Sequence, residues 1–193
     1  MKKIVVPFSI LTGILFFLFS FIYFTNDTNG KQAVQSPIQN QIIPIPTPGT
    51  PIRIIIPAIQ IDAGIQQLGV TSGGEMEVPN TIIDAGWLKS GSRPGEIGSA
   101  VIAGHFNGKN GEPGVFAQLN TLKKGDKIQI TDDTGTSRTF MVRETRIYNP
   151  GYADEVFSKN DAAHLNLVTC NGFWNTDKNS YSKRFVVFAD ITH

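Results

Sequence analysis

The sequence predicts an all-β domain that follows an N-terminal transmembrane helix. An uncharged apolar run begins the chain, a proline-rich segment follows it, and short β-branched runs separated by turn residues fill the rest. The 193 residues suit one domain plus a smaller additional segment. Residues 1–50 hold three of the 17 basic and one of the 16 acidic side chains, which leaves 14 basic and 15 acidic residues in the remainder. A nearly neutral domain argues against a nucleic-acid partner, which needs a basic surface.

The first apolar run has the length of a membrane anchor. Residues 4–24 carry no formal charge, and a helix of this length spans about 31 Å, close to the ~30 Å hydrocarbon core. Lys2 and Lys3 precede the run, so the positive-inside rule predicts a cytoplasmic N-terminus and an extracellular remainder. A cleaved signal peptide is the alternative, but residues 25–30 contain no small-x-small cleavage pattern. We therefore expect residues 1–25 to form a cytoplasmic tip and an uncleaved single-pass anchor.

Residues 26–50 have the composition of a linker. Four prolines, Pro37, Pro44, Pro46 and Pro48, stand among Gln, Asn and Thr. Such a segment cannot bury enough apolar surface to fold, and its prolines stiffen it. The folded domain is accordingly expected at residues 51–193, a length of about 143 residues that supports one hydrophobic core.

The pattern of this domain is typical of a β-sandwich or a β-barrel. Turn residues such as Pro94-Gly95 and Gly108 separate its β-branched runs. The predicted strands are 52–56, 59–68, 100–104, 127–131, 140–147, 165–169 and 185–191. One or two helical turns are expected over 115–122, where Val115, Leu119 and Leu122 recur at helical spacing.

Cys170 is the candidate nucleophile. It is the only cysteine, so no disulfide forms within the chain, and it follows the predicted strand 165–169 directly. A strand end that opens into a loop exposes a side chain on a rigid base, as a nucleophile requires. The alternative is an inert buried thiol, because free cysteine is among the most buried residue types.

A thiol needs a base, and His105 is the best placed of the three histidines. It follows the strand 100–104, so it also lies at a strand end. His164 precedes Cys170 by six residues, roughly 20 Å along an extended strand, and His193 is the terminal residue. The sequence leaves open the alternative that His105 is a loop histidine without a role.

Arg184 is the third candidate, at the start of the last predicted strand. Its guanidinium stays charged and offers several donors, which suits the stabilisation of an oxyanion or a substrate carbonyl. The alternative is a solubility charge at a strand edge. No zinc spacing, phosphate-binding loop or dinucleotide fingerprint is present, so we expect neither a metal nor another cofactor.

Several stretches, in order and spacing, resemble the conserved segments of the sortase family. The stretches are IIIPAI at 54–59, PGEIG at 94–98, AGH at 103–105, GVF at 114–116, LKKGD at 122–126, LVTC at 167–170 and KRFVV at 183–187. The resemblance covers residues 51–193. It implies a closed β-barrel, usually of eight strands, in which Cys, His and Arg meet at one groove.

The resemblance also implies a chemistry and its partners. Cys170 would form a thioester, His105 would serve as acid and base, Arg184 would stabilise the substrate or oxyanion, and Thr169 would line the substrate site. Such enzymes cut an LPXTG-like sorting signal between Thr and Gly on the surface of Gram-positive bacteria. They pass the acyl group to an amine, either a cell-wall precursor or a protein lysine.

The subclass and two alternatives depend on finer features. The region of Trp87 and residues 94–96 favours a small class F or class D sortase. A cysteine peptidase that hydrolyses the same bond is the alternative with the same chemistry. A non-catalytic, membrane-anchored β-domain is the alternative from a different class.

Overall fold

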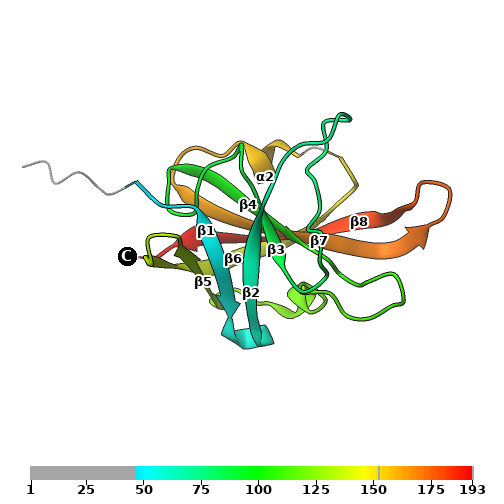
Figure 1. Cartoon of the computed structure of the whole chain (residues 1–193), viewed down its shortest axis with the longest axis horizontal. Coiled ribbons are helices and arrows are strands. Elements are labelled where there is room, and N and C mark those ends of the chain that lie inside the picture. The colour runs from blue at the N-terminus through cyan, green and yellow to red at the C-terminus, as the bar shows by residue number, and fades with distance from the viewer. Residues whose placement is uncertain (1–46, 152, 193) are drawn as a thin grey trace, which may run out of the picture. The chain divides into compact units, whose positions relative to one another are not determined.

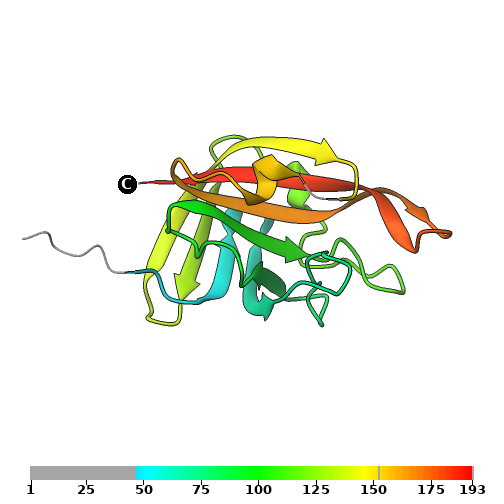
Figure 2. The same ribbon diagram turned by 90° about the horizontal axis from the view of Figure 1, so that it is seen from above.

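The computed structural model describes residues 47–151 and 153–192, which form a closed barrel of eight strands (Figures 1 and 2). The strands are β1 (Pro51–Ile56), β2 (Ile61–Leu68), β3 (Ala85–Leu88), β4 (Gly98–Gly104), β5 (Lys127–Asp132), β6 (Ser137–Tyr148), β7 (Ala163–Asn175) and β8 (Ser180–Ile191). Around the barrel they follow the order β1-β2-β3-β4-β7-β8-β6-β5. The pairs β2–β3 and β4–β7 are parallel and the other pairs are antiparallel. The all-β class and the eight-strand barrel are thus confirmed.

Short helices interrupt the described chain at three places. Two are 3-10 turns, Pro57–Ile59 and Leu119–Thr121, and the third is the four-residue helix α2, Asp154–Phe157. The turn at Leu119–Thr121 lies inside the predicted helical segment. Pro57 starts the first turn and Gln60 ends it with a left-handed φ of 55°, so β2 begins at Ile61 rather than at the predicted Ile59.

Strand β3 was not predicted from the sequence. It has four residues, and Gly86 in its middle is a residue that disfavours strands. The glycine is nevertheless required, because a Cβ there would lie 2.3 Å from a side-chain carbon of buried Leu68. Tertiary packing between β2 and β3 therefore outweighs local preference at this position.

Side chains alternate between the two faces of each strand, and this alternation decides what lies inside the barrel. Leu165 and Leu167 of β7 and Phe185 and Val187 of β8 point into the main core. The intervening residues therefore point outward. A second apolar cluster forms on this outer face, around Val101, Val156, Val186 and Phe188.

Strands β7 and β8 extend well past the barrel, and in both views they project as an arm at one end of the molecule (Figures 1 and 2). The pairing of β4 with β7 ends at Ala103 and Val168, and the pairing of β6 with β8 ends at Tyr148 and Arg184. We call residues 171–183 the β7–β8 arm. The prediction that the strand ends at Cys170 was therefore wrong: the cysteine lies where the barrel sheet gives way to the arm.

The residues just before β1 are held by hydrogen bonds to the turn between β5 and β6. The backbone N–H of Gly49 donates to Asp132 at 3.0 Å, and that of Thr50 donates to Asp133 at 2.9 Å. Asp132 is 3% exposed and also accepts from Arg138 at 2.7 Å. No helix within residues 47–151 and 153–192 is long and apolar enough to cross a membrane, and the predicted anchor lies outside these residues.

Candidate active site

The alternation of side chains puts all three candidate groups on the outer face of one sheet region. Thr169 follows the inward parity of Leu165 and Leu167, so Cys170 points outward. The same parity turns Arg184 outward on β8, next to inward Phe185. His105 directly follows β4. Val101 of β4 points outward, and His105 lies four residues later, so the same alternation turns it outward.

Cys170 and Arg184 are direct cross-strand partners in the β7–β8 ladder. Opposed residues of an antiparallel pair present their side chains on the same face, with Cβ atoms about 4.5–5.5 Å apart. Lys183 pairs with Asn171 instead, and its Nζ donates to Asn149 Oδ1 at 2.7 Å. Arg184 rather than Lys183 therefore shares a face with the thiol.

The parallel pairing of β4 with β7 brings His105 to the level of Cys170. Ile102 pairs with Leu167 and Ala103 with Val168, which is the last pair, and the same offset carried two residues further would match His105 with Cys170. Thr169 maintains this register, since its Oγ1 donates to the Gly104 carbonyl at 2.8 Å. Neighbouring strands are about 4.8 Å apart, and both His105 and Cys170 line one groove.

The His105 ring is oriented by the long β2–β3 loop, residues 69–84. Its Nε2 lies 2.8 Å from the Pro79 carbonyl oxygen, which can only accept, so Nε2 carries a proton. Nδ1 is then the nitrogen that can take up and release a proton. On the other side, the Gly114 backbone passes so close that a Cβ there would lie 2.3 Å from the His105 carbonyl oxygen.

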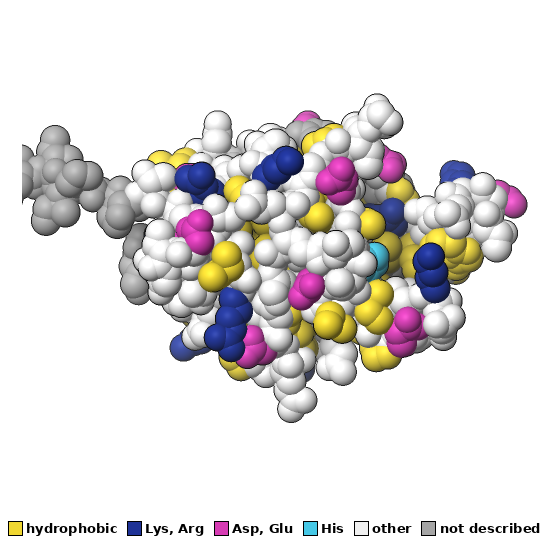
Figure 3. Space-filling model, in the orientation of Figure 1, with side chains coloured by type: hydrophobic (Ala, Val, Ile, Leu, Met, Phe, Trp, Pro, Cys, Tyr) yellow, Lys and Arg dark blue, Asp and Glu magenta, His cyan; other side chains and the backbone are white. Residues whose placement is uncertain are grey.

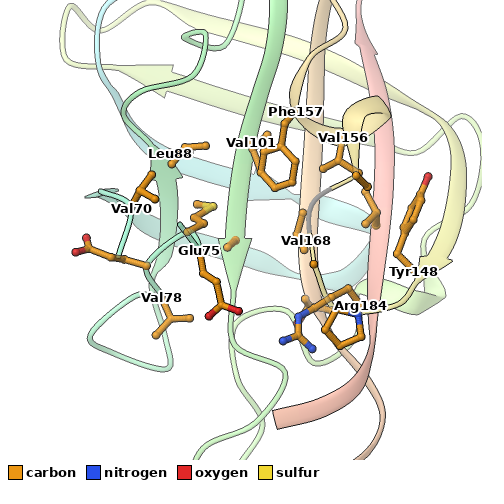
Figure 4. Close-up of a pocket in the computed structure, with 18 of the residues that line it drawn as sticks. Val70, Glu75, Val78, Leu88, Val101, Tyr148, Val156, Phe157, Val168 and Arg184 are labelled. Atoms are coloured by element: carbon orange, nitrogen blue, oxygen red, sulfur yellow. The ribbon is translucent and has the colours of Figure 1, made fainter. Parts of the chain in front are cut away.

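These residues stand at one end of an apolar groove of about 710 Å³. Val101 and Val168 form its floor, and Arg184 lies at the end opposite Phe157 and Val156 (Figure 4). Val186 also lines the groove. The walls are the β2–β3 loop and the segment that contains α2. On the face shown in Figure 3, hydrophobic side chains gather around a histidine in the hollow between the arm and the body of the barrel. The groove is suited to an extended, largely apolar peptide whose end reaches the thiol.

A family model described as the sortase domain matches residues 54–192. The chain belongs to the sortase family. Solved sortases have the same fold: sortase C-1 of Actinomyces oris is 24% identical with a TM-score of 0.58, and covers 74% of this chain and 71% of its own. Sortase A of Corynebacterium diphtheriae is 22% identical with a TM-score of 0.59, over 76% of this chain and 62% of its own. A comparison with curated proteins gave no significant match.

Family membership makes this sortase a cysteine transpeptidase, and the thiol environment bears on how it works. Burial raises the pKa of the Cys170 thiol, and the positive charge of Arg184 opposes that rise. Burial therefore favours the protonated form of this thiol. A base close to Cys170 is needed to generate the thiolate during attack.

Arg184 is held by its own strand and keeps a donor available. Its Nη1 donates to the carbonyls of Tyr181 and Lys183, each at 3.0 Å, and its Nη2 donates to Ser180 Oγ at 3.0 Å. The Nε–H makes no hydrogen bond to any described residue. A fixed guanidinium with an available N–H beside the thiol is the arrangement that can bind an oxyanion.

The other sequence candidates have different surroundings. His164 is 5% exposed at the start of β7 and hydrogen-bonds to Asp190 at 2.7 Å and Asp161 at 2.8 Å, away from the groove. His193 lies outside the described residues. The hydroxyl of Thr169 is committed to Gly104, and substrate contact by this residue stays a prediction.

Sequence reasoning missed two features of this sortase's groove. The Pro79 carbonyl reaches His105 because the β2–β3 loop folds back over it, and no local sequence pattern predicts this contact. Helix α2, which begins at Asp154 and Glu155, is not among the elements predicted from the sequence. Its N-terminal acidic pair is a typical helix-start signal, but four residues are too short for a periodic pattern.

Proposed function

We propose that this sortase cleaves an LPXTG-like sorting signal between Thr and Gly, holds the acyl group on Cys170 and transfers it to an amine. One observation carries the proposal: Cys170, Arg184 and His105 lie together on the outer face at the end of an apolar groove. The apolar floor suits the Leu-Pro part of the signal. The signal would then run along the groove toward the thiol.

The first half-reaction forms the thioester. Cys170 Sγ attacks the threonine carbonyl carbon, and the thiol proton passes to His105 Nδ1. Arg184 stabilises the charge that develops on the carbonyl oxygen. The Thr–Gly C–N bond then breaks as His105 returns its proton to the leaving glycine nitrogen.

The second half-reaction reverses these roles. The acceptor amine attacks the thioester carbonyl and gives a proton to His105, and the C–S bond breaks as Cys170 recovers a proton from the imidazolium. The attacking amine belongs to a cell-wall precursor or to a protein lysine. Water in place of the amine would give hydrolysis, the reaction of a cysteine peptidase.

The product mixture separates these reactions. The full chain in detergent is incubated with an LPXTG-like peptide, with and without a glycine-based amine, and products are identified by mass spectrometry. We expect an amine-linked product that Cys170→Ala does not form. Cleavage that yields only free acid at saturating amine would favour the peptidase.

The same proposal places the enzyme on the outer surface of a Gram-positive membrane. Residues 4–24 and the basic pair before them support a single-pass anchor with a cytoplasmic N-terminus. Because Cys170 is the only cysteine, a membrane-impermeant thiol reagent applied to intact cells tests the orientation directly. Labelling equal to that with a permeant reagent is expected, whereas labelling by the permeant reagent alone would place the domain inside.

A further inference from the structure

The β7–β8 arm needs support from outside itself. Beyond Cys170 and Arg184, its pairs Trp174–Tyr181 and Asn175–Ser180 belong to no wider sheet among the described residues. A bulge between Asn171 and Trp174 interrupts the ladder further. An isolated two-stranded hairpin is marginally stable in water. The position of the arm, and of the two groups at its base, therefore depends on side-chain contacts.

Tyr181 supplies those contacts by joining the arm to the loop that follows His105. We call residues 105–114 the histidine loop. The Tyr181 ring packs edge-on against Phe106, with centroids 5.9 Å apart, and against Trp174 at 5.4 Å. Its hydroxyl donates to Asn107 Oδ1 at 2.9 Å. The two residues directly after His105 are thus both bound by one side chain of the arm.

The same residue also reaches the arginine. The Tyr181 carbonyl accepts from Arg184 Nη1, while neighbouring Ser180 accepts from Nη2. The backbone carbonyl of Tyr181 therefore holds the Arg184 guanidinium, and its side chain holds the segment that carries the His105 imidazole.

We propose that Tyr181 is a positioning residue that locks the histidine loop onto the arm and so sets the geometry among Cys170, His105 and Arg184. The inference rests on the proposed function for its catalytic readout. Tyr181 is absent from the groove lining, so it acts through its neighbours and not through the substrate. Displacement of a reacting group by about 1 Å can cost ~10²-fold in rate, which sets the scale of the effect.

The experiment compares two Tyr181 variants in the full chain. Tyr181→Phe keeps the ring contacts and removes the hydroxyl, so kcat should fall about five-fold, the size of one net hydrogen bond. Tyr181→Leu removes the ring contacts as well, and kcat should fall about 10²-fold. In both variants KM for the peptide should stay within two-fold, because Tyr181 does not line the groove and its apolar floor keeps the same residues. A proportional rise in KM, or a Leu variant within two-fold of wild-type kcat, would overturn the proposal.

A double-mutant cycle and a matched control sharpen the comparison. Asn107→Ala removes the partner of the same hydrogen bond, so its effect should not add to that of Tyr181→Phe. Phe173→Ala serves as the control, since this arm side chain is 70% exposed. Additive losses in the cycle, or an equal loss of kcat in Phe173→Ala, would contradict the specific role of Tyr181.

Amide hydrogen exchange supplies a readout that does not need activity. The Gly114 N–H donates to the Phe106 carbonyl at 3.0 Å and the Gly108 N–H to the Glu112 carbonyl at 2.8 Å, both within or beside the histidine loop. Tyr181→Leu should speed exchange of these two amides at least ten-fold, while the barrel strands β1 and β5 keep wild-type rates. Unchanged loop exchange would overturn the inference. A wild type that exchanges as expected but turns over no peptide would instead refute the proposed function.

Discussion

Cys170 and Arg184 face each other across the β7–β8 ladder, so the thiol and the guanidinium share one face at the base of the arm. Lys183, one residue earlier, faces the other way and binds Asn149. The two side chains point to opposite faces because side chains alternate along a strand. Charge does not explain the difference, since both residues are basic.

The first prediction separates these two basic residues. Arg184→Lys keeps the charge but loses the planar set of donors, so kcat/KM should fall by ~10²–10³-fold. Lys183→Ala should stay within a few-fold of wild type. Both are measured on one LPXTG-like peptide with saturating amine. Near-normal turnover in Arg184→Lys together with collapse in Lys183→Ala would mean that the strand faces the other way.

A second prediction concerns ionisation of the thiol. Burial raises the pKa of Cys170 and the charge of Arg184 lowers it, so Arg184→Gln should raise that pKa further. Alkylation by iodoacetamide requires the thiolate, and its rate is measured from pH 6 to 10 in about half-unit steps. The midpoint of the profile should move to higher pH in the Gln variant. A midpoint that stays in place or moves to lower pH would show that Arg184 does not act on the thiol.

Much of this arrangement could be predicted from the sequence, and the alternation of strands explains why. The β-branched runs around Cys170, His105 and Arg184 mark the three strands that carry the site, and the family resemblance implied the closed barrel. The sequence did not show that β7 and β8 continue past Cys170, because Asn171-Gly172 resembles a turn. In the structure Gly172 has a φ of 82° within a bulge, and the strands pair again at Trp174.

Contacts between segments distant in the sequence could not be predicted. The Pro79 carbonyl meets His105 across 26 residues, and the Tyr181 hydroxyl meets Asn107 across 74. Neither Pro79 nor Tyr181 belongs to a local pattern that identifies a site. Their roles follow from the path of the β2–β3 loop and of the arm.

A third prediction tests the close approach at Gly114. A Cβ at this position would lie 2.3 Å from the His105 carbonyl oxygen, so Gly114→Ala must displace the histidine segment. Activity should fall by ~10²-fold, and overpacking should lower the free energy of unfolding by about 1–3 kcal/mol. Gly108→Ala is the matched control, because the three atoms nearest its new Cβ all belong to the exposed Glu112 side chain and none to the backbone. Equal activity of the two variants would contradict the account of the histidine loop.

A fourth prediction addresses stability at the opposite end of the barrel. Burial raises the pKa of Asp132, but hydrogen bonds from Thr134, Arg138, Gly49 and Thr136 outweigh burial and leave it below its usual range. A depressed carboxyl contributes stability above its unfolded pKa and loses it as pH falls through the folded value. Asp132→Asn should therefore cost roughly 1.5–3 kcal/mol at pH 7, with a smaller difference in acid below about pH 3. Urea unfolding at both pH values checks this, and a difference that grows on acidification would refute the stated cause.

The central claim is that Cys170 carries the acyl group, and trapping that intermediate tests it most directly. The full chain is mixed with an LPXTG-like peptide without amine, quenched in acid and examined by intact mass and peptide mapping. The account predicts an added mass of the peptide acyl fragment on the peptide that contains Cys170, removed by hydroxylamine as a thioester should be. Arg184→Lys should accumulate less of it at equal times. Full turnover by Cys170→Ala, with no adduct on the wild-type thiol, would contradict the account.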